Sequence, residues 1–273
     1  MRYLTARNFA IVNKVIRQPR LAFSKLRSGL SPDSIYSAQS QWTYGTLPRI
    51  SLRRLLPQSC GFDLKLIRPL DRTWMTSITA EELCCLLLVA KAVHAKKVLE
   101  IGTWDGNTSL NLAANMDGKV VTVDLPPDFA GDDHKATLTY PDAELYVTDR
   151  AQLGRQFHGH PLAPRIHQVY GDSAKLDWST LGSPFDLIFI DGCHDFEYVA
   201  SDTANARKHV APGGAIVWHD YAMLWDVSRV VDLTARSADE LKVHAIEGTR
   251  LAVGVRVNET NSTIGSHLAS PQL

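Results

Sequence analysis

The 273-residue chain lacks the features that mark several classes of protein. It has no run of the roughly 18 apolar residues that a membrane-spanning helix needs. Its four cysteines form neither a Cys-x-x-Cys pair nor the spacing of a disulfide framework, so we expect reduced, buried thiols. Its formal net charge is +0, so it lacks the excess positive charge that holds nucleic-acid backbones. We therefore expect no nucleic-acid partner.

Acidic residues are scarce near the N-terminus. Residues 1–75 contain 13 Lys or Arg but only 3 Asp or Glu, so this segment carries +10 and the remainder −10. Such a segment packs on an acidic core or on a second subunit of a homo-oligomer, or it contacts an anionic membrane surface or an acidic substrate. The first 20 residues have no apolar block followed by a small-residue cleavage site, so we expect no secretion signal and a cytoplasmic location.

Regular patterning starts near residue 76. Thr79 and Glu82 have the spacing of a capping box, and Leu83, Leu87 and Ala90 follow at helical spacing. Apolar strand-like runs then alternate with helical ones, which is typical of an α/β protein with a mainly parallel sheet and helices on both faces. The strict alternation from Leu251 to Val257 predicts a late strand, antiparallel to the others.

This pattern divides the chain into three parts. Residues 1–75 are predicted to form a basic arm or cap, residues 76–257 the main domain and residues 258–273 a polar tail. Within the domain, residues 126–164 form a polar, lid-like insert, a common place for substrate selectivity.

In open parallel sheets, ligands bind beyond the carboxyl ends of the strands. The first strand ends in Glu100-Ile-Gly102-Thr-Trp-Asp-Gly106-Asn-Thr108. The two glycines permit a tight turn with a ligand close by, and Thr108 can start the next helix. Glu100 supplies negative charge that suits an ammonium or sulfonium group.

The same loop argues against a dinucleotide cofactor. A pyrophosphate site has the pattern Gly-x-Gly-x-x-Gly, whereas this chain has Trp104 at the second position and Asn107 at the third. A dinucleotide-dependent oxidoreductase remains an alternative, which tight binding of NAD would identify.

The next two strand ends also present carboxylates. Asp124 lies about 20 residues beyond the first loop, where an acid accepts hydrogen bonds from both hydroxyls of a ribose. The third strand ends in Gly171-Asp172-Ser173, and Asp172 can accept a hydrogen bond from an adenine amino group. Asp and Ser are also ordinary turn residues.

Together these motifs resemble those of class I S-adenosylmethionine-dependent methyltransferases. The stretches are LEIGTWDGNTSL, VTVDLPP, YGDSA and FDLIFIDGCHDFEYVASD with VAPGGAIVWHDY. The first loop is similar to that of catechol-type O-methyltransferases, and the last two stretches resemble bacterial enzymes acting on sugars and other natural products. The resemblance covers residues 76–257 and implies a Rossmann-like fold with a seven-stranded sheet.

The resemblance implies transfer of a methyl group to a hydroxyl of a small molecule. The positions predicted to surround S-adenosylmethionine are Glu100, Gly102, Thr103, Trp104, Gly106, Thr108, Asp124, Leu125, Asp172 and Ser173. It also places a divalent metal, of the Mg or Mn type, at Asp191, His219 and Asp220, and His194 as the base.

The chemistry of these residue types agrees with those roles. A divalent ion on Asp191 and Asp220 could bind both oxygens of a vicinal diol and lower the pKa of one hydroxyl, which His194 would deprotonate. Related metal-dependent enzymes carry a carboxylate where this chain has His219, so His219 either shifts the metal preference or orients the acceptor.

Two further alternatives stay open. His194, His219 and a carboxylate could form the two-His, one-carboxylate site of a non-haem iron oxygenase, although the cofactor-type strand ends would then be unexplained. The chain could also bind S-adenosylmethionine without catalysis, as a scaffold or regulator, because fold does not fix function.

Overall fold

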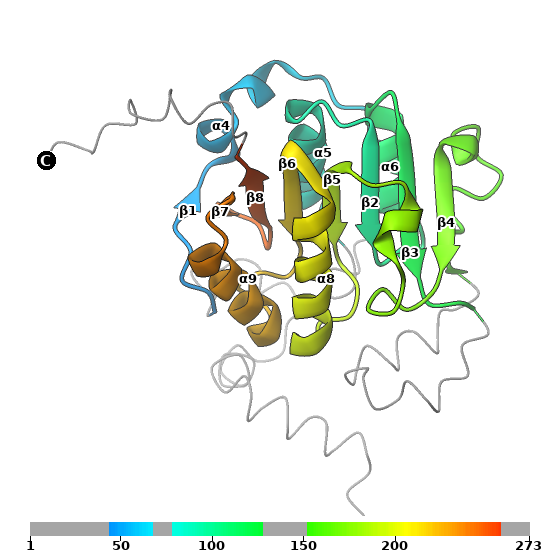
Figure 1. Ribbon diagram of the computed structural model, residues 1–273. Coiled ribbons are helices and arrows are strands. Elements are labelled where there is room, and N and C mark those ends of the chain that lie inside the picture. Colours follow the sequence, from blue (N-terminus) through cyan, green and yellow to red (C-terminus); the bar gives the residue numbers. More distant parts are fainter. Residues whose placement is uncertain (1–43, 68–77, 128–151, 258–273) are drawn as a thin grey trace, which may run out of the picture.

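The computed structural model describes residues 44–67, 78–127 and 152–257. These residues form one eight-stranded sheet flanked by helices on both faces (Figure 1). The strands are β1 (Arg49–Ile50), β2 (Lys97–Ile101), β3 (Lys119–Asp124), β4 (Ile166–Tyr170), β5 (Phe185–Ile190), β6 (Val210–Trp218), β7 (Leu241–Ile246) and β8 (Ala252–Arg256). Their order in the sheet is β1-β7-β8-β6-β5-β2-β3-β4.

The sheet is parallel except at β8, which pairs antiparallel with β6 on one side and with β7 on the other. This confirms the predicted α/β fold with one late antiparallel strand. The sheet has eight strands rather than the predicted seven, because β1 pairs with β7. β1 contains two residues, too few to show an alternating pattern in the sequence.

The helices cover both faces of the sheet. They are α4 (Leu52–Leu55), α5 (Ala80–Ala92), α6 (Asn107–Asn115), α8 (Phe196–His209) and α9 (Trp225–Ser237), with short 3-10 turns η2 (Pro57–Gly61), η4 (Ala163–Arg165) and η5 (Trp178–Leu181). α8 and α9 lie on the near face in Figure 1, and α5 and α6 lie behind the strands. The predicted capping box at Thr79 and Glu82 is present at the start of α5.

Alternation of side chains along each strand divides the core into two clusters. In β5, Leu187 and Phe189 pack with Leu83 of α5, whereas Ile188 and Ile190 pack with residues of α8 and α9 such as Val199 on the other face. All of these side chains are at least nine-tenths buried. Burial on both faces explains why the strands are continuously apolar.

The register places the candidate site residues at one edge of the sheet. Ile101 at the end of β2 is paired with Val123 of β3 and with Ile190 of β5, and Ile190 is paired with Trp218 of β6. Parallel strands in register end together, so the residues that follow them, including Asp124, Asp191 and His219, lie along the same edge.

Parts of the predicted domain organisation lie outside the described residues. They are the tail 258–273, positions 128–151 of the insert, positions 1–43 and 68–75 of the basic arm, and the first two positions of the main domain, 76–77. The described end of the arm is part of the domain, since β1 joins the sheet and Leu52 and Leu56 are buried in the core.

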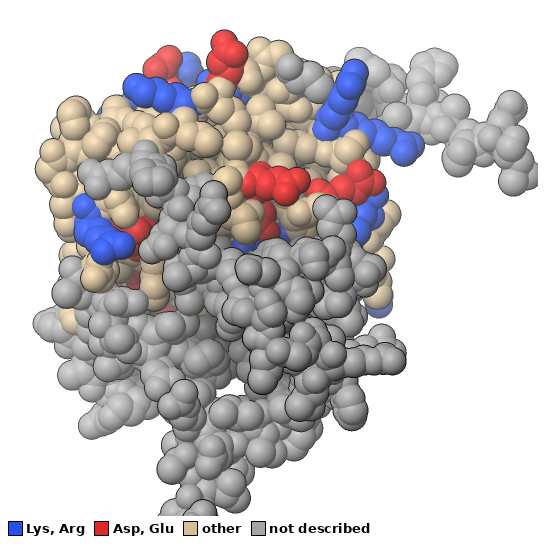
Figure 2. Space-filling model, turned by 180° about the vertical axis from the view of Figure 1, so that it is seen from behind, with Lys and Arg blue, Asp and Glu red and all other residues tan. Residues whose placement is uncertain are grey.

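Two features of the described residues concern possible partners, namely their helix hydropathy and their surface charge. Over residues 44–67, 78–127 and 152–257, we find no helix with the length and hydropathy of a membrane span. Basic and acidic side chains are mixed over the described part of the face shown in Figure 2. The described part of that face therefore gathers no broad patch of one sign.

Candidate active site

The loop after β2 has the tight conformation that its two glycines predict. Gly102 and Gly106 have φ angles of +98° and +83°, values that favour glycine. A Cβ on Gly102 would collide with the carbonyl of Asp191, and one on Gly106 with the ring of Phe157. Gly106 is the N-cap of α6, which starts at Asn107, one residue before the predicted start at Thr108.

Asp124 fastens this loop to the end of β3. Its Oδ2 accepts hydrogen bonds from the backbone N–H of Thr103 (2.9 Å) and of Trp104 (3.0 Å), and its Oδ1 accepts one from Leu125 (2.8 Å). Burial raises the pKa of Asp124 to about 6, although these backbone bonds act in the opposite direction. The Asp124 carboxylate thus holds three other residues predicted to surround the cofactor.

Residues 152–157, from the described end of the predicted insert, pack on the same loop. The N–H of Gly154 donates to the carbonyl of Trp104 (2.8 Å), and the N–H of Gln156 donates to the carbonyl of Asp105 (2.9 Å). Phe157 lies against Gly106. These contacts place the described end of the insert beside the predicted cofactor loop.

Glu100 lies below the loop rather than on its surface. Its side chain is 1% exposed, and its Oε2 accepts hydrogen bonds from the hydroxyls of Ser109 and Thr122. Burial raises the pKa of Glu100 to about 8, against the effect of those two bonds. Its role as a charge facing a sulfonium remains a prediction, which this buried position does not favour.

Asp172 and Ser173 follow β4 and are both buried. Asp172 Oδ2 accepts a hydrogen bond from the hydroxyl of Tyr198 on α8 (3.1 Å), and Lys175 Nζ lies 3.6 Å from the same oxygen. The carbonyl of Ser173 accepts from Trp178 Nε1 (2.9 Å). The contact with an adenine amino group stays a prediction.

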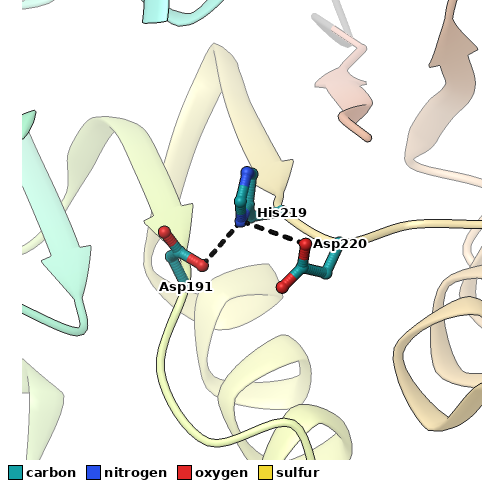
Figure 3. A group of neighbouring side chains, drawn as sticks. All are labelled: Asp191, His219 and Asp220. Carbon is teal, nitrogen blue, oxygen red and sulfur yellow. Dashed lines mark hydrogen bonds and ion pairs between the residues drawn. The ribbon is translucent and has the colours of Figure 1, made fainter. Parts of the chain in front are cut away.

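The three predicted metal ligands come together at the ends of β5 and β6 (Figure 3). One ligand atom from each of Asp191, His219 and Asp220 lies within 4.8 Å of the others. His219 Nδ1 is 2.9 Å from Asp191 Oδ1 and 3.5 Å from Asp220 Oδ1. His219 is thus hydrogen-bonded to one of the carboxylates with which it would share an ion.

The other nitrogen of His219 is engaged as well. His219 Nε2 lies 3.2 Å from Glu82 Oε2 of α5. Burial lowers the pKa of His219, but the charges of Asp191 and Asp220 outweigh this effect and raise it well above the ordinary value. A histidine binds metal through an unprotonated ring nitrogen, so His219 would have to release a proton and its bond to Asp191 to act as a ligand, and that role stays a prediction.

Asp220 also has a cation beside it. Arg250 Nη1 donates to Asp220 Oδ1 (2.8 Å), and the guanidinium is 1% exposed. Burial raises the pKa of Asp220, but His219 and Arg250 lower it well below its ordinary range. Asp220 has a left-handed φ of +55°, a strained conformation of the kind often found at functional sites.

His194 stands at the open side of this cluster. Its Nε2 lies 3.2 Å from Asp220 Oδ2, and its side chain is 25% exposed. A carboxylate beside one ring nitrogen orients an imidazole and stabilises its protonated form. The predicted base and a predicted metal ligand therefore form a His–Asp pair.

Two members of the cluster were missed from the sequence as site residues. Glu82 is recognisable there only as part of a capping box, and Arg250 precedes a strand without any motif around it. Both side chains are buried, and Arg250 bonds to both carboxylate oxygens of Glu82. Their proximity results from packing between residues 168 positions apart.

The described architecture has relatives of known type. The family described as methyltransferase domain matches residues 99–221. The matched region includes the β2 loop, Asp124, His194 and Asp220. The match covers less than half of the chain, and residues 99–221 are called the methyltransferase domain below. The predicted resemblance to class I methyltransferases is confirmed for this region.

Individual relatives agree with this assignment. The chain is 32% identical to catechol O-methyltransferase of Mycobacterium tuberculosis over 117 residues, which are 42% of this chain and 44% of that protein. The match thus spans less than half the length of that relative.

Solved structures show the fold. A Klebsiella pneumoniae protein with a provisional O-methyltransferase assignment superposes with a TM-score of 0.50 at 20% identity, covering 76% of this chain and 89% of its own. The Podospora anserina methyltransferase PaMTH1, solved with S-adenosylhomocysteine bound, gives 0.50 at 13% identity, with coverage of 79% and 91%. The methyltransferase domain therefore has the Rossmann-like fold expected of it.

Proposed function

We propose that this chain is an S-adenosylmethionine-dependent O-methyltransferase that acts on a hydroxyl of a small molecule. The observation that carries the proposal is the His194–Asp220 pair beside the loop held by Asp124, at one edge of the sheet. The mycobacterial relative is a catechol O-methyltransferase, which supports a vicinal diol, in a phenol or a sugar, as the acceptor.

The β2 loop and the ends of β3 and β4 would bind the methyl donor. The Asp124 carboxylate, already fixed by three backbone N–H groups, would accept hydrogen bonds from the ribose hydroxyls. The turn Gly102–Gly106 would allow close approach of the methionine part, and Asp172, after β4, would accept a hydrogen bond from the adenine amino group. The bound S-adenosylhomocysteine in PaMTH1 supports a donor of this class.

His194 would activate the acceptor. The acceptor oxygen loses its proton to the His194 imidazole and forms a bond to the methyl carbon as the bond from that carbon to sulfur breaks. The sulfonium becomes a neutral thioether, and the electron pair of the broken bond stays on sulfur. Asp220, 3.2 Å from His194 Nε2, stabilises the imidazolium.

No step of this mechanism passes through a metal ion, because His219 and Asp220 are engaged by Asp191, Glu82 and Arg250. Membrane contact through the basic arm and assembly into a homo-oligomer stay predictions, since residues 1–43 lie outside the described part of the chain.

The test is transfer of a labelled methyl group from S-adenosylmethionine to 1,2-dihydroxybenzene and to a panel of sugar diols. The His194→Ala variant is expected to lower kcat about 10²- to 10⁴-fold, the usual contribution of a general base, with an unchanged Kd for S-adenosylmethionine by calorimetry. His167→Ala, which changes an exposed histidine of β4, serves as the control and should retain full activity.

Other outcomes identify the alternatives. Binding of S-adenosylmethionine without transfer to any hydroxyl compound in a cell extract would indicate a scaffold. Tight NAD binding in place of S-adenosylmethionine would indicate an oxidoreductase.

A further inference from the structure

A buried ion pair lies directly behind the proposed active site. Arg250 Nε donates to Glu82 Oε1 (2.9 Å) and Nη2 donates to Oε2 (2.7 Å), so the guanidinium holds the carboxylate through two parallel bonds. The backbone N–H of Arg250 also donates to Oε1 (2.8 Å). Both side chains are at most 2% exposed, and both lie outside the region that matches the methyltransferase domain.

This pair is connected to the reacting end of the site. Arg250 Nη1 bonds to Asp220 Oδ1, whose other oxygen lies 3.2 Å from His194 Nε2. Glu82 Oε2 lies 3.2 Å from His219 Nε2, and His219 Nδ1 contacts Asp191. The contacts thus run from α5, through Arg250 and Asp220, to the proposed base.

Stability alone is a weak explanation for such a pair. Removing two charges from water costs several kcal/mol per ion, and replacing a buried ion pair with packed apolar residues is often neutral or stabilising. The position of Arg250, bonded at once to Glu82 and Asp220, points instead to a role in the site.

The Arg250 guanidinium supplies the positive charge that a divalent ion would supply beside Asp220. A metal held by Asp191 and Asp220 would fix both carboxylates and supply positive charge between them. Here Arg250, which keeps its charge at every accessible pH, fixes Asp220, while His219 faces Asp191 through Nδ1 and Glu82 through Nε2. Three donor atoms of an ion site, His219 Nδ1, Asp191 Oδ1 and Asp220 Oδ1, are therefore already engaged by other side chains.

We propose that the Glu82–Arg250 pair replaces the metal ion in this site and holds Asp220 in the orientation that positions His194, so that methyl transfer needs no divalent cation. Glu82 and Arg250 are positioning residues, since both side chains are buried and act through Asp220 and His219. This role rests on the methyl transfer proposed above.

The first test measures metal binding without any turnover. Full-length protein freed of metal with a chelator is titrated with Mn²⁺, and the free ion is followed by electron paramagnetic resonance. We expect the wild-type protein and Asp191→Asn to give the same titration. Stoichiometric Mn²⁺ binding by the wild type that Asp191→Asn abolishes would overturn the proposal, whatever the enzyme does with acceptors.

The second test removes the pair as a unit. The double variant Glu82→Gln/Arg250→Met removes one positive and one negative charge together, so the net charge of the core is unchanged, and it should lower kcat with 1,2-dihydroxybenzene about 100-fold, the size of effect that misplacing a catalytic group by about 1 Å produces. The Kd for S-adenosylmethionine should stay within about twofold, because the pair does not contact the β2 loop. The single variant Arg250→Lys, which keeps the charge, should have a kcat between those of the double variant and the wild type.

The Arg207–Glu240 pair provides a matched control. Its Nε–Oε1 distance is 2.7 Å, and it lies at the end of α8 and the start of β7, away from the site. Arg207→Met/Glu240→Gln should leave kcat unchanged. An unchanged kcat in the Glu82/Arg250 double variant, or loss of wild-type turnover on chelation, would contradict the proposal. Absence of methyl transfer in every protein would refute the proposed function instead, and the Mn²⁺ titration would still decide the metal question.

Discussion

At the residue scale, Glu100 shows how burial changes the chemistry of a side chain whose type and place were predicted. It occupies the expected strand end, but its carboxyl is 1% exposed and bonded to Ser109 and Thr122. With its pKa raised to about 8, the folded protein keeps this group protonated at neutral pH. The sequence shows where a carboxyl stands along a strand, whereas its burial depends on the helix that packs over it.

This shift predicts a pH dependence of stability. The unfolded chain releases the Glu100 proton near the ordinary pKa of 4.5, whereas the folded protein holds it to about 8. Unfolding therefore releases a proton between these values, and this residue lowers the free energy of unfolding as the pH rises from about 4.5 to about 8. Glu100→Gln should flatten that decline, which urea unfolding at pH 5, 6, 7 and 8 would measure.

Glu81→Gln is the control for the Glu100 experiment. Glu81 is exposed in the first turn of α5, and its replacement should leave the pH profile of the wild type. A Glu100→Gln profile parallel to that of the wild type would show that Glu100 is ionised in the folded protein.

The residues that were foreseen and those that were missed differ in how they are brought together. Asp124, Asp191 and Asp220 each follow an apolar strand, and the rule that parallel strands end at one edge is sufficient to predict that they lie together. Arg250 and Glu82 meet through packing of α5 against the segment that precedes β8, and no local pattern in the sequence encodes that contact. The contact of His219 with Glu82 could not be foreseen for the same reason.

At the element scale, the β2 loop depends on Asp124 for its shape. Asp124→Ala removes the acceptor for two loop N–H groups as well as the expected partner of the ribose. Since a hydrogen bond to a charged group contributes about 1.5–3 kcal/mol, we expect the Kd for S-adenosylmethionine to rise at least about tenfold, as measured by titration calorimetry.

Asp186 also accepts backbone hydrogen bonds, but at the opposite ends of the strands from Asp124. Its Oδ2 accepts hydrogen bonds from the N–H groups of Lys96 (2.8 Å) and Lys97 (2.9 Å) at the start of β2. Asp186→Ala should therefore lower the free energy of unfolding but leave the affinity for S-adenosylmethionine unchanged. Equal affinities in the Asp124 and Asp186 variants would remove the ribose assignment.

Elements with strong periodicity were predicted closely. The predicted helix start at Thr108 compares with an observed start at Asn107, and the predicted capping box at Thr79 and Glu82 begins α5 as expected. The error at α6 has a physical cause, because the helix is capped by the left-handed Gly106 and not by a side chain. β1 could not be predicted, since a two-residue strand is defined by its partner β7.

At the scale of the whole molecule, the described end of the basic arm completes the fold. The N–H of Tyr44 donates to the carbonyl of Ala222 (3.2 Å), and the N–H of Leu47 donates to the Tyr221 hydroxyl (2.9 Å). This segment therefore runs beside the loop that follows Asp220 and then continues to β7. The predicted boundary at residue 75 separates parts of one core, because composition and charge change along the sequence without regard to which side chains pack together.

Leu52 and Leu56 test this integration. Both are less than one-tenth exposed and belong to the core cluster that contains α5 and β5. If residues 44–67 are part of the domain, Leu52→Ala and Leu56→Ala should each lower the free energy of unfolding by about 2 to 5 kcal/mol, as buried Leu-to-Ala changes do. Leu66→Ala, at a side chain 49% exposed, should change it by less than about 0.5 kcal/mol. Urea unfolding in one cooperative transition with these differences would establish a single core, whereas small effects at Leu52 and Leu56 would make this segment a separate cap.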